Sequence, residues 1–129
     1  LGVADRVTFT GRVSDEQLRA PLTGATAFVI ASIAELQSIA TMEAMASGLP
    51  ILAADAMALP HLVHHGENGY LFQPGNDREL ADRITQVLTA TREQYSAMQQ
   101  HSLEAVKVHD LDRTLDTFEA LYRGETPAK

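Results

Sequence analysis

The sequence predicts an α/β fold with a doubly wound parallel sheet and a helical C-terminal tail. Short apolar runs of strand length alternate with helix-start signals, which is the order of elements in a doubly wound sheet. Two of these runs, residues 27–31 and 51–54, are apolar without alternation, as in strands covered on both faces. The chain after residue 76 shows only helical periodicity. Together these observations favour parallel strands joined by helices.

The first predicted unit is a strand followed by a short helix. Val7–Thr10 is rich in β-branched and aromatic residues and ends at a glycine, so we expect a strand. Ser14 and Gln17 have the spacing of a capping box at a helix start. We expect Pro21 and then Gly24 to disturb this helix.

A second strand and helix follow, leading into a third strand. Residues 27–31 form the strand, and Ser38 can cap a helix over residues 39–46. Gly48 fits the position that ends this helix in a left-handed conformation. The run at 51–54 is then the next buried strand.

The remaining elements are a short helix, a turn, a strand and the helical tail. Pro60 begins a short helical segment, residues 65–69 form a turn, and residues 70–72 form a strand. Asn76 and Glu79 repeat the capping-box spacing. Three helices are expected from apolar residues at helical spacing: Leu80, Ile84, Val87 and Leu88; Tyr95, Met98 and Val106; and Leu111, Leu115, Phe118 and Tyr122.

Composition narrows the class of protein. The 129 residues include no cysteine, which excludes disulfides, thiolate metal sites and a cysteine nucleophile. Ten basic and 17 acidic residues give a net charge of −7, which does not favour nucleic acid as a partner. No apolar run reaches the length of a membrane span, so we expect a cytoplasmic location. The chain begins at Leu1 without methionine, which suggests a piece of a longer protein.

The loop after the second predicted strand carries the strongest candidate site. In a doubly wound sheet ligands bind beyond the carboxyl ends of the strands, and Glu35 lies in such a loop. The backbone amides of residues 37–40 form a helix N-terminus, which favours an anion such as phosphate. Glu43 lies on a helix that is apolar or small on every face, so we expect it to be buried and hydrogen-bonded. Its two oxygens would suit two hydroxyls on adjacent carbons, such as those of ribose.

A purely structural interpretation of these two carboxylates stays open. Glu43 could accept hydrogen bonds from backbone amides or a core arginine, and Glu35 could be a solvated loop residue. The histidines at 61, 64 and 65 have a spacing that could place two on one helical face, but zinc needs more ligands than this, so a turn on the surface is favoured. We therefore expect no metal site.

The motifs of this chain resemble those of a known enzyme family. Seven residues separate Glu35 from Glu43, and Ala-Met-Ala-Ser-Gly-Leu-Pro follows. This is similar to the E-x7-E signature of retaining glycosyltransferases of family 4, or glycosyl transferases group 1, which have the Rossmann-like GT-B fold. Further matches in the same order are DRVTFTGRV at residues 5–13, LPHLV at 59–63 and GENGYLF at 66–72. The resemblance covers nearly the whole chain.

The resemblance implies a role for each site residue. Glu35, as the catalytic candidate, would contact hydroxyls of the donor sugar, and Glu43 would contact the nucleotide ribose. The reaction implied is retaining transfer of a sugar from a UDP- or GDP-linked donor to an acceptor hydroxyl, without a cofactor or an obligatory metal. The backbone that would hold the diphosphate and sugar is that of Gln37, Ser38, Ile39 and Ala40, and the loop that would pack on the nucleobase is Gly11, Arg12 and Val13.

Some positions depart from the family pattern. Leu36 and the two residues after it replace a Phe-Gly pair, which is a weak hint of a lipid acceptor. Residues 56–58, Ala-Met-Ala, replace a glycine pair, and His61 replaces a glutamate. These changes leave both candidate carboxylates in place.

The family's arginine–lysine phosphate clamp and its N-terminal acceptor domain have no counterpart in this chain. We therefore expect residues 1–129 to be a partial C-terminal donor-binding domain that is inactive alone. The acceptor, a lipid or polysaccharide, would bind the missing N-terminal domain, and the full-length enzyme could be peripheral to the inner face of the membrane. Loss of neighbouring strands would leave a sheet edge open to self-association.

Two alternatives to an enzyme part remain. One is a non-catalytic α/β module that binds a nucleotide sugar or another protein, since fold alone does not confer activity. The other is a flavodoxin-like receiver, which would need acidic residues after the first strand, where the chain has Thr10-Gly11-Arg12.

Overall fold

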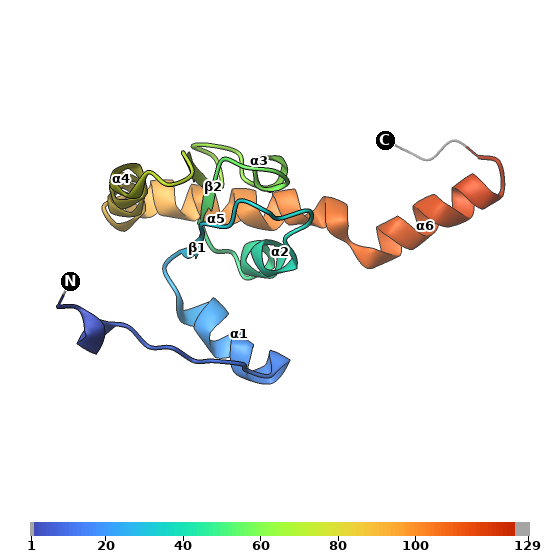
Figure 1. Cartoon of the computed structure of the whole chain (residues 1–129). Coiled ribbons are helices and arrows are strands. Elements are labelled where there is room, and N and C mark those ends of the chain that lie inside the picture. The colour runs from blue at the N-terminus through green and yellow to red at the C-terminus, as the bar shows by residue number, and fades with distance from the viewer. Residues whose placement is uncertain (1, 126–129) are drawn as a thin grey trace.

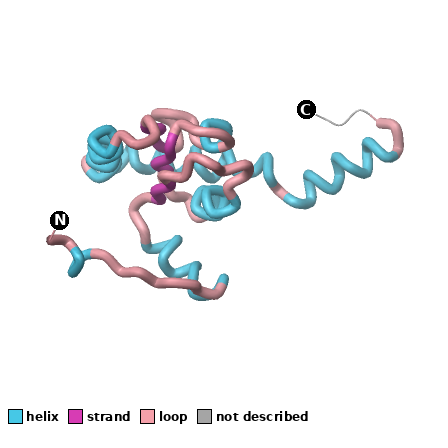
Figure 2. The backbone as a smooth tube through the Cα atoms, in the orientation of Figure 1, coloured by secondary structure: helices cyan, strands magenta, loops and turns pink. Residues whose placement is uncertain are grey.

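The computed structural model describes residues 2–125 and has a parallel three-stranded sheet at its centre (Figures 1 and 2). The strands are β1 (Phe28–Ile30), β2 (Ile51–Ala54) and β3 (Gly69–Phe72), in the order β1-β2-β3. Residue 29 pairs with residue 52, and residue 52 with residue 70. The carboxyl ends of all three strands therefore meet at one edge of the sheet.

Helices connect and surround the strands, so the predicted α/β fold with a parallel sheet and a helical tail is confirmed. In Figure 1, α4 lies on one side of the strands, and α2 and α3 lie on the other. No helix within residues 2–125 is long and apolar enough to cross a membrane. The helices are α1 (Asp15–Gly24), α2 (Ile39–Ala46), α3 (Leu59–Leu62), α4 (Asp77–Leu88), α5 (Arg92–Val106) and α6 (Leu111–Tyr122), with 3-10 turns at Ala4–Arg6 and Lys107–His109.

The core forms around β2. All four β2 residues are buried, as its unbroken apolar sequence predicts. Helices α2 and α3 cover the strand with Met45 and Leu59, both fully buried. Burying each of these side chains stabilises the fold by about 1.5–3 kcal/mol.

Helix α5 is fastened to the sheet by side-chain hydroxyls. The buried Ser102 hydroxyl donates to the carbonyl of Leu49 at 2.7 Å and also lies 3.4 Å from that of Asn68. At the other end of the helix, the Tyr95 hydroxyl donates to the carbonyl of Thr26 at 2.9 Å. These bonds satisfy backbone groups just before all three strands.

The turn into β3 depends on two adjacent residues. Asn68 is buried; its side-chain oxygen accepts from the His64 N–H at 2.7 Å, and its side-chain nitrogen donates to the carbonyl of Leu62 at 3.0 Å. Gly69 has φ +154°, and a Cβ there would lie 1.8 Å from the carbonyl oxygen of Ile51. The predicted turn is confirmed, and only glycine fits its second position.

The expected strand at Val7–Thr10 was wrong. These residues form no strand and are exposed, and Phe9 exposes 92% of its surface. An extended segment becomes a strand only when a neighbour pairs with it, and none does so within residues 2–125. For the same reason β1 is an edge strand, and Val29 is 44% exposed where burial on both faces was expected.

Helix α1 begins as predicted and continues further than expected. Ser14 and Gln17 form both hydrogen bonds of the capping box. Pro21 lies inside the helix, which runs to Gly24 without breaking. The missing N–H of Pro21 removes one helical bond, but its carbonyl still accepts from Ala25 at 3.0 Å.

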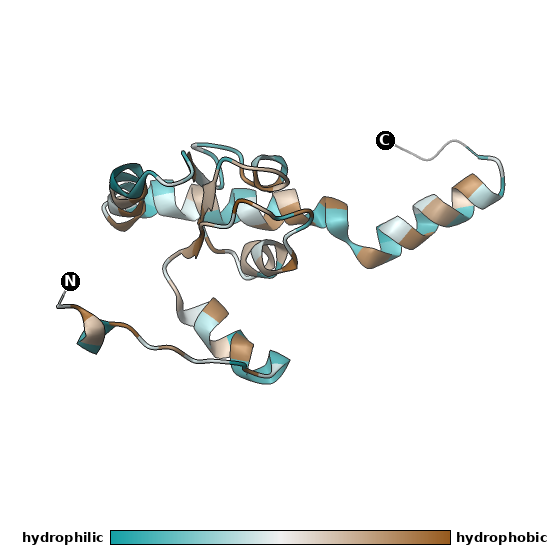
Figure 3. Ribbon diagram, viewed as in Figure 1, coloured by the Kyte–Doolittle hydropathy of each residue, from teal (hydrophilic) through white to brown (hydrophobic). Residues whose placement is uncertain are grey.

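Periodicity located the C-terminal helices but overstated their burial. Val87 and Met98 are buried, whereas Leu88 is 63% exposed. Helix α6 extends away from the core (Figure 1), and its apolar positions recur along an uncovered helix (Figure 3). Its exposed apolar residues are Leu111, Leu115, Phe118, Leu121 and Tyr122.

Candidate functional site

The N-terminus of α2 lies beyond the carboxyl end of β1, where the sequence places the anion site. Ser38 is the N-cap residue and is 2% exposed, but its hydroxyl makes no capping bond to the backbone. It lies 2.8 Å from the hydroxyl of Thr41 instead. Within the described chain the backbone N–H groups of residues 37–40 donate no hydrogen bond. The first turn of α2 therefore presents free donors and the positive end of its dipole to an anion.

Of the two candidate carboxylates, one differs from expectation. Glu35 is half-buried in the loop before α2, but Glu43 is exposed, so its predicted burial was wrong. Helix α2 buries Thr41, Ala44 and Met45 on one face and leaves Glu43 on the other. Its small apolar residues had suggested burial all round, yet alanine is tolerated on an exposed helix face. Among the described residues, the one side-chain hydrogen bond that involves Glu43 goes to its backbone carbonyl, from Ser47, so the exposed carboxylate is open to a ligand.

Backbone contacts hold the Glu35 loop in place. The carbonyl of Glu35 accepts from the N–H of Ala58 at 3.1 Å, which joins the loops after β1 and β2. Next to this bond, Met57 has φ +51°, a left-handed conformation that is unusual for a residue other than glycine. Met57 lies within residues 56–58, the stretch that stands where the family resemblance leads us to expect a glycine pair.

No sequence signal marks Thr41 or Ala58 as a positioning residue. Thr41 lies in an apolar helical pattern, and Ala58 acts only through its backbone N–H. Their parts in the site depend on contacts that a sequence pattern does not contain.

The third candidate segment, Gly11 to Val13, lies directly before α1. Gly11 and Arg12 are exposed, Val13 is half-buried, and Gly11 has φ +62°. None of the three makes a hydrogen bond to the Glu35 loop or to α2. The structure therefore brings Glu35 and α2 together at one edge but does not join this segment to them.

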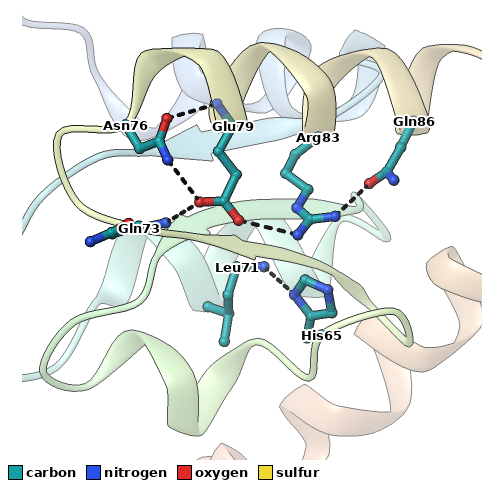
Figure 4. Close-up of polar contacts among 7 residues, drawn as sticks. All are labelled: His65, Leu71, Gln73, Asn76, Glu79, Arg83 and Gln86. Atoms are coloured by element: carbon teal, nitrogen blue, oxygen red, sulfur yellow. Dashed lines mark hydrogen bonds and ion pairs between the residues drawn. The ribbon is translucent and has the colours of Figure 1, made fainter.

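A separate polar cluster lies beyond β3 (Figure 4). The Glu79 carboxylate accepts from the Gln73 N–H at 2.9 Å and from the Arg83 guanidinium at 3.1 Å. The Gln73 N–H, and after it Arg83, hold the pKa of Glu79 below its ordinary value. The Arg83 guanidinium also lies 5.7 Å from the centre of the Tyr70 ring. Because both carboxylate oxygens of Glu79 accept hydrogen bonds, this cluster holds α4 against the end of β3.

The three clustered histidines are all exposed. His64 faces Glu67 at 3.6 Å, and His65 accepts from the Leu71 N–H through Nδ1 at 3.1 Å. The described residues contain no group of three or more histidine, cysteine, aspartate or glutamate side chains that could hold a metal ion.

Comparison with known proteins identifies the family. Residues 1–104 match the model of the family described as glycosyl transferases group 1. The chain belongs to this family. One similar sequence is the MMP alpha-(1->4)-mannosyltransferase of Mycolicibacterium hassiacum, which is 40% identical over 94 residues, or 72% of this chain. The D-inositol 3-phosphate glycosyltransferase of Mycolicibacterium smegmatis is 31% identical over 98% of the chain.

Solved structures support the same fold. Sucrose-phosphate synthase from Thermosynechococcus elongatus aligns with a TM-score of 0.84 and 28% identity, over 95% of this chain and 31% of its own. The pneumococcal O-GlcNAc transferase GtfA in complex with UDP and GlcNAc aligns with a TM-score of 0.77 and 22% identity, over 93% of this chain and 24% of its own. The second likeness shows the fold alone.

This glycosyl transferases group 1 chain is much shorter than the relatives that it matches. It spans 23% of the length of the mannosyltransferase and 30% of that of the inositol phosphate enzyme.

Proposed function

We propose that this chain is the donor-binding part of a retaining family 4 glycosyltransferase, which transfers a sugar from a UDP- or GDP-linked donor to an acceptor hydroxyl. The observation that carries the proposal is the uncapped N-terminus of α2, with Glu35 before it and Glu43 one turn into the helix. Free N–H groups at this position suit a diphosphate, whose negative charge they stabilise as the sugar leaves.

In this proposal the two carboxylates bind the remaining parts of the donor, which are the ribose and the sugar to be transferred. Glu43 is exposed, and in the described chain the Ser47 hydroxyl bonds to its backbone carbonyl and not to its carboxylate, so the carboxylate oxygens are free for the ribose hydroxyls. Glu35 lies in the loop that the Ala58 N–H holds, and in this proposal it contacts the sugar. Gly11, Arg12 and Val13 would pack on the nucleobase of the donor once a neighbouring part of the enzyme positions them. No cofactor or metal is required.

The relatives guide the proposal for the acceptor. The phosphatidyl-myo-inositol mannosyltransferase of Mycobacterium leprae, 32% identical over 84% of this chain and spanning 29% of that enzyme, is named for a lipid acceptor. We propose a lipid or polysaccharide acceptor, bound by a domain that this chain does not contain. Sugar transfer then requires that further domain, and residues 1–129 alone bind without turnover.

Titration of the full-length enzyme with UDP- and GDP-sugars tests the donor site. Glu43→Ala removes the carboxylate that would hold the ribose, and loss of one charged hydrogen bond weakens binding about tenfold or more. Glu16→Ala is the matched control, because Glu16 is an exposed glutamate on α1, away from the proposed donor site. Unchanged donor affinity in Glu43→Ala would count against the proposal.

The non-catalytic alternative is tested in the same enzyme. Glu35→Gln keeps the size of the side chain and removes its charge, so a catalytic role predicts a fall in kcat with donor affinity largely kept. A module that only binds the nucleotide sugar would show donor binding but no transfer in the wild-type enzyme with any acceptor.

A further inference from the structure

The loop that follows β2 is a short link between two buried residues. Ala54 ends β2 and Leu59 begins α3, and both are fully buried. Within the link, the Asp55 N–H donates to the carbonyl of Phe72 at 2.8 Å. The Leu59 N–H donates to the carbonyl of Ala56 at 3.2 Å. Because the link is fixed at both ends and bonded along its length, its backbone has little choice of path.

Met57 takes a left-handed conformation inside this link, with φ +51°. In the part of the chain that the structure describes, no other residue except glycine has a positive φ. The Met57 side chain is 57% exposed, so its burial does not account for the strain. Strained backbone of this kind persists only where the surrounding structure imposes it, and it is concentrated at functional sites.

The next residue, Ala58, makes the contact that gives this conformation a role. Its N–H donates to the carbonyl of Glu35 at 3.1 Å. Within residues 2–125 this is the one hydrogen bond that joins residues 32–37 to another segment. The Ala58 N–H lies in the peptide plane that joins Met57 to Ala58, so the conformation of Met57 sets the direction of this donor.

We propose that Met57 is a positioning residue for Glu35. Its left-handed backbone directs the Ala58 N–H at the Glu35 carbonyl and so holds the Glu35 carboxylate where it meets the transferred sugar. The step that concerns the sugar rests on the function proposed above, whereas the backbone contact does not. The role belongs to the backbone of Met57, so any side chain that accepts a left-handed conformation can serve.

Three variants of the full-length enzyme separate the backbone of Met57 from its side chain. Met57→Val keeps an apolar side chain, but a residue branched at Cβ is strongly disfavoured at positive φ. We expect its kcat to fall by up to about 100-fold, because small displacements of a catalytic group are costly. Its donor affinity should be kept, since the α2 amides and Glu43 are unchanged. Asparagine accepts the left-handed conformation best after glycine, so Met57→Asn should keep kcat near that of the wild type.

Met57→Ala is the third variant and keeps the test decisive if Met57→Val does not fold. Alanine and asparagine both remove the apolar side chain, and the position is 57% exposed, so both variants should fold. The proposal predicts that both retain kcat. A large loss of kcat in both would assign the role to the Met57 side chain and overturn the proposal.

Amide hydrogen exchange, followed by NMR in the donor-free enzyme, reads the contact without any activity. The Ala58 amide should exchange slowly in the wild type and in Met57→Asn, and faster in Met57→Val. The Asp55 amide, bonded to the Phe72 carbonyl, is the internal control and should stay slow in all three.

The two measurements fail in different ways. An Ala58 amide that stays slow in Met57→Val, or one that becomes fast while kcat is unchanged, would overturn the positioning role of Met57. Full activity in Glu35→Gln would instead reject the role of Glu35 in the proposed function, because the exchange rates do not depend on that role.

Discussion

The hydroxyl of Ser38 lies 2.8 Å from the hydroxyl of Thr41, and both residues are buried at the start of α2. This contact draws the N-cap side chain away from the backbone that it would otherwise cap. It therefore keeps the first-turn N–H groups free while satisfying two buried hydroxyls.

Thr41→Val tests what this contact contributes. The substitution leaves the buried Ser38 hydroxyl without its partner, and we expect the free energy of unfolding to fall by about 1–3 kcal/mol in urea. Thr41→Ser keeps the hydroxyl and loses only a methyl group, so it should be the milder of the two. Because valine keeps the methyl group of threonine and lacks only its hydroxyl, a Thr41→Val variant as stable as the wild type would show that the hydrogen bond contributes little.

The left-handed backbone at Met57 predicts a stabilising substitution. A residue with a Cβ costs about 1–2 kcal/mol in this conformation, and glycine avoids that cost but loses more entropy on folding. Since Met57 is 57% exposed, little packing is lost, and Met57→Gly should raise the free energy of unfolding by up to about 1 kcal/mol. Met57→Ala keeps the Cβ and should bring no such gain. If Met57→Gly is less stable than Met57→Ala, the left-handed backbone at residue 57 is not strained.

The Glu79 cluster predicts a stability that depends on pH. Because the pKa of Glu79 is lower in the folded chain, its contribution is present above its unfolded pKa and is lost as the pH falls through the folded value. In thermal melts Glu79→Gln should be less stable than the wild type at neutral pH, and the difference should shrink in acid. Asp82→Asn, also on α4 but exposed, should show little of this convergence. If the difference in stability between Glu79→Gln and the wild type does not change with pH, the charge of Glu79 is not what stabilises the fold.

Two glycines with positive φ should differ sharply on substitution. Gly69→Ala places a Cβ 1.8 Å from the Ile51 carbonyl oxygen, so β2 and β3 cannot keep their pairing, and we expect loss of cooperative unfolding by circular dichroism. Gly75 has φ +79° with nothing within 4 Å, so Gly75→Ala meets only backbone strain. That variant should fold with a loss of about 1–2 kcal/mol. Retention of a native spectrum by Gly69→Ala would be inconsistent with the close approach of the two strands.

Local patterns predicted the elements well because short-range chemistry decides them. The cap at Ser14, the stop at Gly48 and the buried run of β2 each depend on residues a few positions apart, and all three are confirmed. The Val7–Thr10 strand failed because pairing depends on a neighbour that local sequence does not specify.

The site was predicted less completely than the fold. The position of Glu35 and the free N-terminus of α2 follow from strand order and helix geometry. The exposure of Glu43 did not follow, since an alanine-rich helix can turn either face to the solvent. The roles of Thr41 and Ala58 require knowledge of which groups meet in space.

The hydroxyls of Tyr95 and Ser102 have a consequence for the order of folding during synthesis. They bond to carbonyls 69 and 53 residues earlier in the chain, just before β1 and β2. As the chain leaves the ribosome, the three strands emerge well before the helix that satisfies these carbonyls. The strands are therefore present before the hydroxyls that bind these carbonyls, and a chain truncated before Arg92 would keep β1, β2 and β3 but lack helix α5, which holds them together.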